Sequence, residues 1–219
     1  MADPVMRFRL ASEPAGEERE RGARLFSGPV AFLTGAADHD GFPSPDRIEV
    51  CFAGRSNVGK SRLVNALTSR KSLARISGTP GRTQQINFFS LGDRHYLVDV
   101  PGYGFARAPL RSVKKWQSLL RAYLAGRVSL RRVFLLIDAR HGPKPPDIEI
   151  MDLLDRTAVT FQVILTKTDK VSQEGQESAF VKTARALEHH PAAFPEIIPT
   201  SAVTGCGIDR LRSIIAGFE

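Results

Sequence analysis

The 219-residue chain contains only two cysteines and has no long hydrophobic run. No apolar stretch approaches the roughly 18 residues that a membrane-spanning helix needs, so we expect no membrane contact. Residues 1–24 hold no apolar core of the signal-peptide type and no lipidation motif is visible, so neither export nor a lipid anchor is expected. Cys51 and Cys206 lie far apart and form no metal-type cluster, which favours a reducing, cytoplasmic location.

Acidic residues are scarce in the middle of the chain. Between Arg55 and Arg132 there are 16 lysines and arginines but only two acids, Asp93 and Asp99, which makes this stretch +14 and leaves −6 for the remainder. One interpretation is a solvated basic face. The other is a polyanionic partner such as nucleic acid, whose phosphates would attract these cations and release counterions.

The length and the hydrophobic content of 42% suit one well-buried domain. We expect a partly flexible N-terminal arm over residues 1–45, in which "EPAGEERERGAR" is either a frayed tail or a short helix. A single domain then covers residues 46–219. Within it, strand patterns over 47–54, 86–100, 133–139, 159–169 and 196–202 alternate with helical patterns over 61–69, 112–126, 147–156, 176–190 and 207–218.

This alternation predicts an α/β fold with a mostly parallel sheet and helices on both faces. The segment 86–100 reads as a hairpin around "LGDR". In such sheets, ligands bind beyond the carboxyl ends of the strands. The residues that directly follow strands are therefore the candidates for function.

The stretch "GRSNVGKS", from Gly54 to Ser61, matches G-x-x-x-x-G-K-[ST] and stands between a strand and a helix. Gly54 and Gly59 allow the tight turn in which backbone N–H groups surround phosphate oxygens. Lys60 would reach the β- and γ-phosphates, Ser61 would bind Mg²⁺, and the helix N-terminus would face the same phosphates. The alternative is a simple tight turn.

Three further motifs follow later strands. In "DVPG", Asp99 can hold Mg²⁺ through water and the Gly102 N–H can contact a γ-phosphate. In "TKTD", the Asp169 carboxylate can accept two hydrogen bonds from guanine, an edge that adenine lacks, and the Lys167 stem can pack along the base. The alternative for Asp169 is a helix N-cap. "TSA", which ends at Ala202, offers N–H groups to the guanine O6.

Together these motifs resemble those of a Ras-like GTPase domain. The segments "FAGRSNVGKSRLVNAL", "TPGRTQQINFF", "LVDVPGYGFA", "IDARHGP", "ILTKTDK" and "TSAVTGCGID" resemble the EngB (YihA/YsxC) family of bacterial GTPases, implicated in assembly of the large ribosomal subunit. The resemblance runs from about Glu49 to the C-terminus, whereas the first 45 or so residues match poorly. It implies a three-layer P-loop fold whose sheet has one antiparallel edge strand.

The resemblance also implies the site and its ligands. The ligands would be GTP or GDP, Mg²⁺ and, through Asn57, K⁺, although Asn57 could simply shape its loop. Thr83 would close over Mg²⁺ from a switch I segment, and "PGYGFARAP" would be switch II. The nucleotide contacts implied are Gly54, Arg55, Ser56, Asn57, Val58, Gly59, Lys60, Ser61, Gly81, Arg82, Thr83, Asp99, Val100, Pro101, Gly102, Thr166, Lys167, Thr168, Asp169, Thr200, Ser201 and Ala202.

One position departs from Ras-like proteins. Tyr103 follows D-x-x-G, where those proteins have the glutamine that orients the attacking water. We therefore expect slow hydrolysis by the chain alone, with faster turnover supplied by a cation, a partner's group or a rearranged switch. The catalytic residue is left unassigned.

The expected partner is the 50S subunit, through rRNA and ribosomal proteins, and the expected cellular role is growth and cell division through ribosome biogenesis. We expect a monomer. The candidate rRNA face comprises Arg107, Arg111, Lys114, Lys115 and Arg121.

The aromatic residues are assigned to packing. Trp116 and Tyr123 could stack on bases, but their spacing of seven favours the core. Phe88 and Phe89 are adjacent in a strand, so we expect one to face the core and the other to be exposed.

Two rival functions remain. A small-molecule kinase could use the same phosphate loop, but a kinase that acts on ATP has no use for a guanine-reading acid. A nucleotide-gated trafficking or signalling module is disfavoured by the basic switches and by the absence of a lipid signal.

Overall fold

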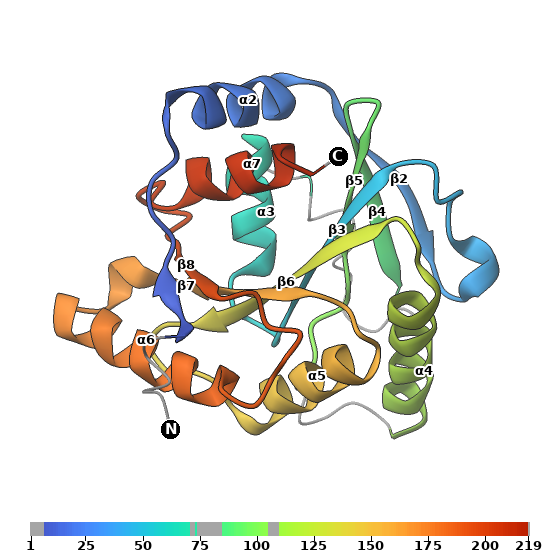
Figure 1. Cartoon of the computed structure of the whole chain (residues 1–219). Helices are drawn as coiled ribbons and strands as arrows, with labels where there is room; N and C mark the ends of the chain where they lie inside the picture. The colour runs from blue at the N-terminus through green and yellow to red at the C-terminus, as the bar shows by residue number, and fades with distance from the viewer. Residues whose placement is uncertain (1–6, 71–72, 74–84, 105–109, 219) are drawn as a thin grey trace.

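The computed structural model describes residues 7–70, 73, 85–104 and 110–218, and for residues 110–115 only the backbone. Its helices and strands alternate along the chain as expected (Figure 1). The strands are β1 (Arg9–Leu10), β2 (Val30–Ala36), β3 (Ile48–Gly54), β4 (Ile86–Leu91), β5 (His95–Asp99), β6 (Leu130–Asp138), β7 (Phe161–Thr166) and β8 (Glu196–Pro199). The helices are α2 (Gly16–Ser27), α3 (Lys60–Thr68), α4 (Leu110–Gly126), α5 (Pro145–Arg156), α6 (Gln173–Leu187) and α7 (Ile208–Ala216), with short 3₁₀ turns η1 (His39–Gly41) and η3 (Thr168–Lys170).

The strands form one sheet in the order β1-β8-β7-β6-β3-β5-β4-β2. β4 runs antiparallel to both of its neighbours, and the other pairs are parallel. The predicted mostly parallel α/β fold is therefore confirmed. The antiparallel strand lies one place inside the edge, because β2 pairs along its outer side.

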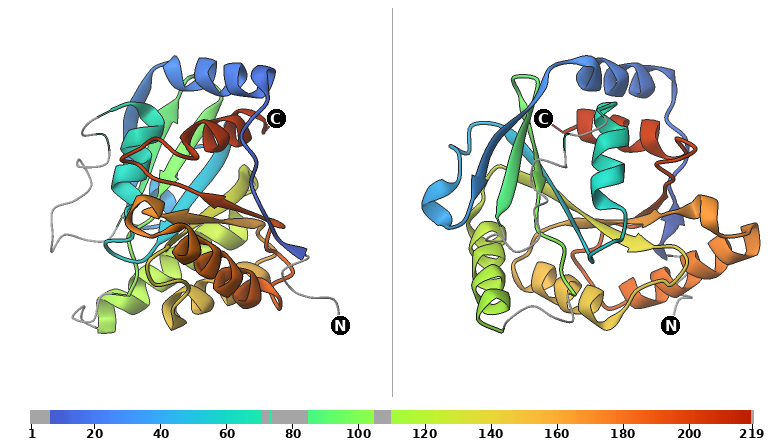
Figure 2. Two further views of the ribbon diagram at one scale, coloured as in Figure 1. Left: turned by 90° about the vertical axis from the view of Figure 1, so that its left-hand side faces the viewer. Right: turned by 180° about the vertical axis from the view of Figure 1, so that it is seen from behind.

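Helices cover both faces of the sheet and make three layers (Figure 2). α4, α5 and α6 pack on one face, α3 and α7 pack on the other, and α2 lies across α7. Successive residues of β3 alternate between the two faces, so Cys51 joins one hydrophobic cluster and Phe52 the other.

The same two-sided burial corrects the expectation for Phe88 and Phe89. Both side chains are fully buried, each in a different cluster. The predicted exposed face of β4 does not exist, because Phe26 and Val30 from the N-terminal region pack in the cluster that receives Phe89.

The N-terminal region contributes to both ends of the sheet. Arg9 and Leu10 pair with β8. The segment Val30–Ala36 forms β2, a strand that the sequence pattern did not indicate, and it pairs with β4. Of the two alternatives for the charged segment, the helix is the one observed, as α2. The division into an arm and a domain at residue 46 stays a prediction.

Trp116 and Tyr123 lie in the core, as their spacing predicted. The Tyr123 hydroxyl donates to the buried Glu49 carboxylate (2.9 Å), which also accepts from Ser129 (3.0 Å) and pairs with Arg127. A buried carboxylate needs such partners. This network ties the end of α4 to the start of β3.

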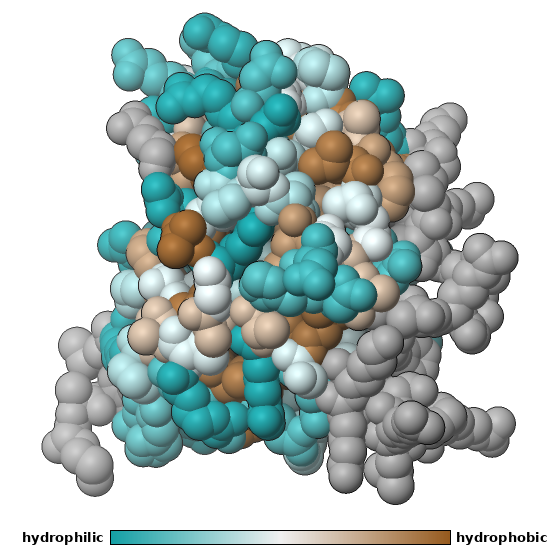
Figure 3. Space-filling model, turned by 90° about the vertical axis from the view of Figure 1, so that its right-hand side faces the viewer, coloured by the Kyte–Doolittle hydropathy of each residue, from teal (hydrophilic) through white to brown (hydrophobic). Residues whose placement is uncertain are grey.

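No described helix has the length and apolarity to span a bilayer. On the face that carries β2 and α4, hydrophobic residues form separate patches among hydrophilic ones (Figure 3). Phe32 and Leu33 of β2 are among the exposed large hydrophobic residues, at 39% and 48% exposure.

Candidate nucleotide-binding site

The phosphate loop joins the carboxyl end of β3 to the first turn of α3. Gly59 is the N-cap of α3 and has a φ of +108°, a backbone conformation that residues with a side chain rarely adopt. At Gly54 an added Cβ would lie 2.9 Å from Val58 Cγ1 and 3.0 Å from Leu136 Cβ, so only glycine fits. The first N–H groups of a helix have no acceptor within it, so the loop presents them beyond the sheet edge.

The D-x-x-G segment is joined to this loop by backbone hydrogen bonds. The Tyr103 N–H donates to the Gly54 carbonyl (3.3 Å), and the Ser56 N–H donates to the Tyr103 carbonyl (3.0 Å). Val100 is buried and packs in the core, so only its backbone is available to a ligand. Gly102 therefore lies beside the phosphate loop, where the sequence analysis expected it.

Lys60 and Asp99 form an ion pair, and both side chains are largely buried. The sequence analysis gave these groups separate tasks, phosphate binding for Lys60 and Mg²⁺ binding for Asp99. In the structure each neutralises the other's charge. A nucleotide and its metal would supply the replacement partners, so binding exchanges one set of charge contacts for another.

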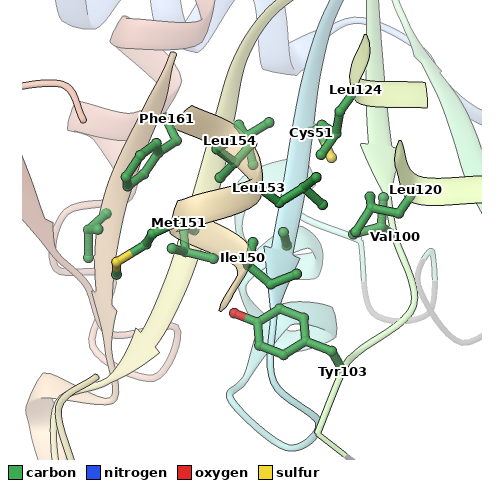
Figure 4. Packing of buried hydrophobic residues seen from close by; sticks show 14 of the residues in the cluster. Cys51, Val100, Tyr103, Leu120, Leu124, Ile150, Met151, Leu153, Leu154 and Phe161 are labelled. Atoms are coloured by element: carbon green, nitrogen blue, oxygen red, sulfur yellow. The ribbon is translucent and has the colours of Figure 1, made fainter. Parts of the chain in front are cut away.

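The Tyr103 side chain packs in the core. It is 5% exposed, and its ring lies next to Ile150 with the hydroxyl toward α5 (Figure 4). The hydroxyl donates to Asp147 Oδ1 (2.9 Å). Burial, together with the charge of Asp147, raises the pKa of Tyr103 well above its ordinary value. The phenol is therefore neutral, and its hydroxyl is engaged by Asp147.

Asp147 is a residue that the sequence analysis missed. Its carboxylate is fully buried and also accepts from Arg55 Nε of the phosphate loop (2.9 Å) and from the Lys144 N–H at the start of α5 (2.8 Å). It therefore connects the phosphate loop, the residue after D-x-x-G and the N-terminus of α5. A carboxylate in the first turn of a helix was the only sequence signal for it.

A pocket opens between the phosphate loop and the two later loops. It collects Gly59 from the first, Lys167 and Asp169 from the second, and Thr200 and Ala202 from the third. Hydrogen bonds hold the loops in place: Thr166 Oγ1 donates to the Val58 carbonyl (2.7 Å), and Thr168 Oγ1 donates to the Thr200 carbonyl (3.1 Å). Three motifs far apart in sequence thus meet at one edge of the sheet.

Asp169 is held by Ser201, whose hydroxyl donates to Asp169 Oδ1 (2.7 Å). This bond lowers the pKa of Asp169, so the carboxylate is ionised. Asp169 does not cap the following helix, because the N-cap of α6 is Ser172, which accepts from the Gly175 N–H. The N-cap alternative fails, and a charged carboxylate borders the pocket.

Lys167 is anchored from two sides. Its Nζ donates to the Asn57 carbonyl (2.7 Å) and to Asp138 Oδ2 (2.8 Å). Burial raises the pKa of Asp138, but hydrogen bonds from Arg140 and Lys167 outweigh it and hold that pKa far below its ordinary value. Asp138, at the end of β6 in the "IDARHGP" segment, is a second positioning residue that the sequence analysis left without a role.

Asn57 has a structural reason to be where it is. It adopts a left-handed conformation, with φ +63°, which asparagine tolerates better than most residues. The loop-shaping alternative is therefore supported, and the K⁺ role stays a prediction.

Part of the predicted site lies outside the described residues. This applies to Gly81, Arg82 and Thr83 of the predicted switch I, and to Arg107 of the candidate rRNA face. Arg111, Lys114 and Lys115 lie on α4, where only the backbone is described, and Arg121 is exposed on the same helix.

The chain is similar to known GTP-binding proteins over nearly its full length. A family model described as "50S ribosome-binding GTPase" matches residues 49–167. The probable GTP-binding protein EngB of Jannaschia sp. (strain CCS1) is 59% identical over 212 residues, which cover 97% of each chain. The probable EngB of Rhodospirillum rubrum is 49% identical, covering 94% of this chain and 91% of its own. The similarity therefore extends into the first 45 residues, which the sequence analysis judged a poor match.

Solved structures agree in fold. The crystal structure of a probable GTP-binding protein engB covers 77% of this chain and 97% of its own at 25% identity, with a TM-score of 0.62. Era, solved with MgGDPNP and nucleotides 1506–1542 of 16S ribosomal RNA, shares the fold at 22% identity and a TM-score of 0.58, covering 78% of this chain and 56% of its own. The 59% identity over nearly the full length shows the family as well as the fold. This chain belongs to the EngB family of GTP-binding proteins and carries a P-loop GTPase domain.

Proposed function

We propose that the chain is a guanine-specific, Mg²⁺-dependent GTPase of low intrinsic rate that acts in assembly of the 50S ribosomal subunit. The observation that carries the nucleotide part is the pocket between the three loops, with the ionised Asp169 held on its border by Ser201. A carboxylate there can pair with guanine N1–H and N2–H, and an adenine edge would leave it unpaired.

The residues around the phosphate loop suit a magnesium nucleotide. Ser61 offers an exposed hydroxyl in the first turn of α3, and Asp99 offers a carboxylate at the end of β5. Hydroxyl and carboxylate oxygens are the donors that Mg²⁺ prefers. Bound Mg²⁺ would neutralise charge on the phosphates, while Lys60, released from Asp99, would bind phosphate oxygens. Thr83 would complete the metal site from switch I.

Slow hydrolysis follows from the position of Tyr103. Its hydroxyl is bound to Asp147 in the core, so it has no route to a water molecule at the γ-phosphate. A cation near Asn57, a partner's group or a rearranged switch would supply the missing stabilisation, and the catalytic group stays unassigned.

The ribosomal part is supported by the charge distribution and by the description of the matching family. The stretch of net charge +14 holds the phosphate loop, both switch segments and α4. Phosphate-rich rRNA is the natural counterpart of such a stretch. Because the nucleotide controls the switches, the basic residues near them would engage rRNA in one nucleotide state only. The chain would act as a cytoplasmic monomer, and growth and cell division would depend on it through ribosome supply.

Co-sedimentation with purified 50S subunits tests this proposal. The chain loaded with a non-hydrolysable GTP analogue should pellet with the subunits, and the chain loaded with GDP should remain in the supernatant. A control in which Arg24, Arg156, Lys182 and Arg185 become alanine removes four exposed cations outside the basic stretch, and it should pellet like the wild type. Equal sedimentation in both nucleotide states would contradict the gating, and no sedimentation in either state would contradict the partner.

A further inference from the structure

A second pocket lies near the amino end of β6, whereas the phosphate loop follows the carboxyl end of β3. It has a volume of about 210 Å³ and is bordered by α2, β6, α7 and the C-terminal Phe218. Arg132, at the start of β6, pairs with Val50, four residues before Gly54. At about 3.3 Å per residue the two sites are roughly 13 Å apart along the strand. The pocket therefore does not belong to the nucleotide site.

Arg132 is a partly buried cation that forms no ion pair with any described carboxylate. Its guanidinium carbon lies 3.9 Å from the ring centre of Phe194 and 4.9 Å from that of Phe218. Its Nη1 donates to Gln162 Oε1 (2.8 Å), its Nε has no partner, and no described acid lies within ion-pair distance. Burial lowers the pKa of Arg132 to about 10, against the more distant attraction of Glu196. A partly buried charge without compensation is unfavourable, so a bound anion would stabilise this side chain.

The acids beside the pocket are already used. Glu18 pairs with Arg210 (3.3 Å), and Glu196 pairs with both Arg210 (3.2 Å) and Arg9 (3.2 Å). Arg21 follows Glu18 by one helical turn on α2 and forms no ion pair with any described residue. Its guanidinium lies over the end of α7, with Nη2 3.5 Å from a Cβ built at Gly217. Two positive side chains, Arg21 and Arg132, therefore border the pocket without an ion-pair partner among the described residues.

We propose that this pocket binds a phosphate group, with Arg132 and Arg21 as its principal ligands. A planar guanidinium can donate two parallel hydrogen bonds to a phosphate. The rings of Phe194 and Phe218 restrict the orientation of the Arg132 guanidinium. The pocket has room for an entire phosphate ion. The phosphate could be a free ion or part of an RNA backbone, because both present the same oxygens.

Titration of inorganic phosphate into the full chain tests this proposal. The protein is first saturated with Mg²⁺-GDP so that the phosphate loop is occupied, and chloride at equal ionic strength serves as the blank. We expect one saturable site by calorimetry. Arg21→Ala and Arg132→Lys should each weaken it by roughly tenfold. Arg24→Ala, one turn along α2 and outside the pocket, is the matched control and should bind as the wild type does.

Absence of saturable binding, or an equal loss in Arg24→Ala, would overturn the proposal. Arg21 is exposed, so its variant keeps the test valid even if Arg132→Lys folds poorly. A short single-stranded RNA added in competition distinguishes the sources: it displaces phosphate if the site takes an RNA backbone and leaves phosphate bound if the site takes the free ion. The nucleotide proposal is independent, because GDP affinity and GTP hydrolysis of Arg21→Ala are measured separately.

Discussion

The hydroxyl of Tyr103 donates a 2.9 Å hydrogen bond to the buried carboxylate of Asp147, which also holds Arg55 of the phosphate loop. The residue in the place of the usual glutamine is thus part of the core, and it connects two loops that contact nucleotide in the proposed site. We therefore expect substitution of Tyr103 to change the stability of the fold and to leave the rate of GTP hydrolysis unchanged.

We therefore predict that Tyr103→Phe lowers the free energy of unfolding by about 0.5–1.5 kcal/mol, because one hydrogen bond is lost. Asp147→Asn should cost more, about 3 kcal/mol, because Arg55 also loses its charged partner. Urea denaturation measures both. The intrinsic GTP hydrolysis rate of Tyr103→Phe should equal that of the wild type, and a large loss of rate would mean that the phenol acts on the substrate.

Guanine selectivity should depend on Asp169. In Asp169→Asn the side chain no longer accepts both guanine N–H groups, so GTP affinity should fall by more than roughly tenfold while xanthosine triphosphate gains. Competition titrations with the two nucleotides measure this change. Ser201→Ala, which loosens Asp169 without removing its charge, should give a smaller loss and no change of preference. Unchanged GTP affinity in Asp169→Asn would remove the assignment.

The ion pair between Lys60 and Asp99 leads to a third prediction. Lys60→Ala should lose nucleotide, because a charge-assisted phosphate contact disappears. Asp99→Asn should retain GDP in the absence of Mg²⁺, because Lys60 no longer has to leave a carboxylate. Ser61→Ala should reduce GTP affinity with Mg²⁺ more than GDP affinity without it. Equal losses under both conditions in Ser61→Ala would count against a metal ligand at that position.

The candidate rRNA face should determine how strongly subunit binding depends on salt concentration. If Arg107, Arg111, Lys114 and Lys115 contact rRNA phosphates, replacing all four with alanine should flatten the log–log salt slope by roughly 0.7 to 0.9 per lost contact. Nucleotide affinity should stay the same. A slope equal to that of the wild type in salt-titrated sedimentation would mean that these side chains are merely solvated.

Acid should weaken the fold through His95, which is buried on β5 and whose ring nitrogens make no well-aligned hydrogen bond with any described residue, although the backbone of Ile215 and Phe218 lies nearby. Burial lowers the pKa of His95 below 6.5, so the folded state prefers the neutral ring. The stability is complete above the unfolded pKa near 6.5 and is lost as the pH falls toward the folded value. The urea midpoint should therefore decline below pH 6.5. His95→Leu should decline less, and an identical decline would assign the effect to other groups.

The local sequence was sufficient to predict the elements and loops that form the candidate nucleotide site. Gly59 precedes a helix, Asp99 ends a strand and Asp169 lies shortly after one, and in a parallel sheet the carboxyl ends of the strands meet on one side. The order of the motifs along the chain therefore predicts that they lie together. Asn57, in contrast, has a left-handed backbone that explains its identity without a cation.

Only the tertiary structure decided how the buried groups are paired. Phe89 is buried because Phe26 and Val30 from the N-terminal region pack in the same cluster, and the Tyr103 hydroxyl is satisfied in the core because Asp147, 44 residues away, accepts its hydrogen bond. Asp138 and Arg132 acquired roles in the same way, through partners distant in sequence. Periodicity reports which face of an element is apolar, but it carries no information about what that face meets. Long-range pairing depends on the packing of the whole chain, and so it became visible only in the folded molecule.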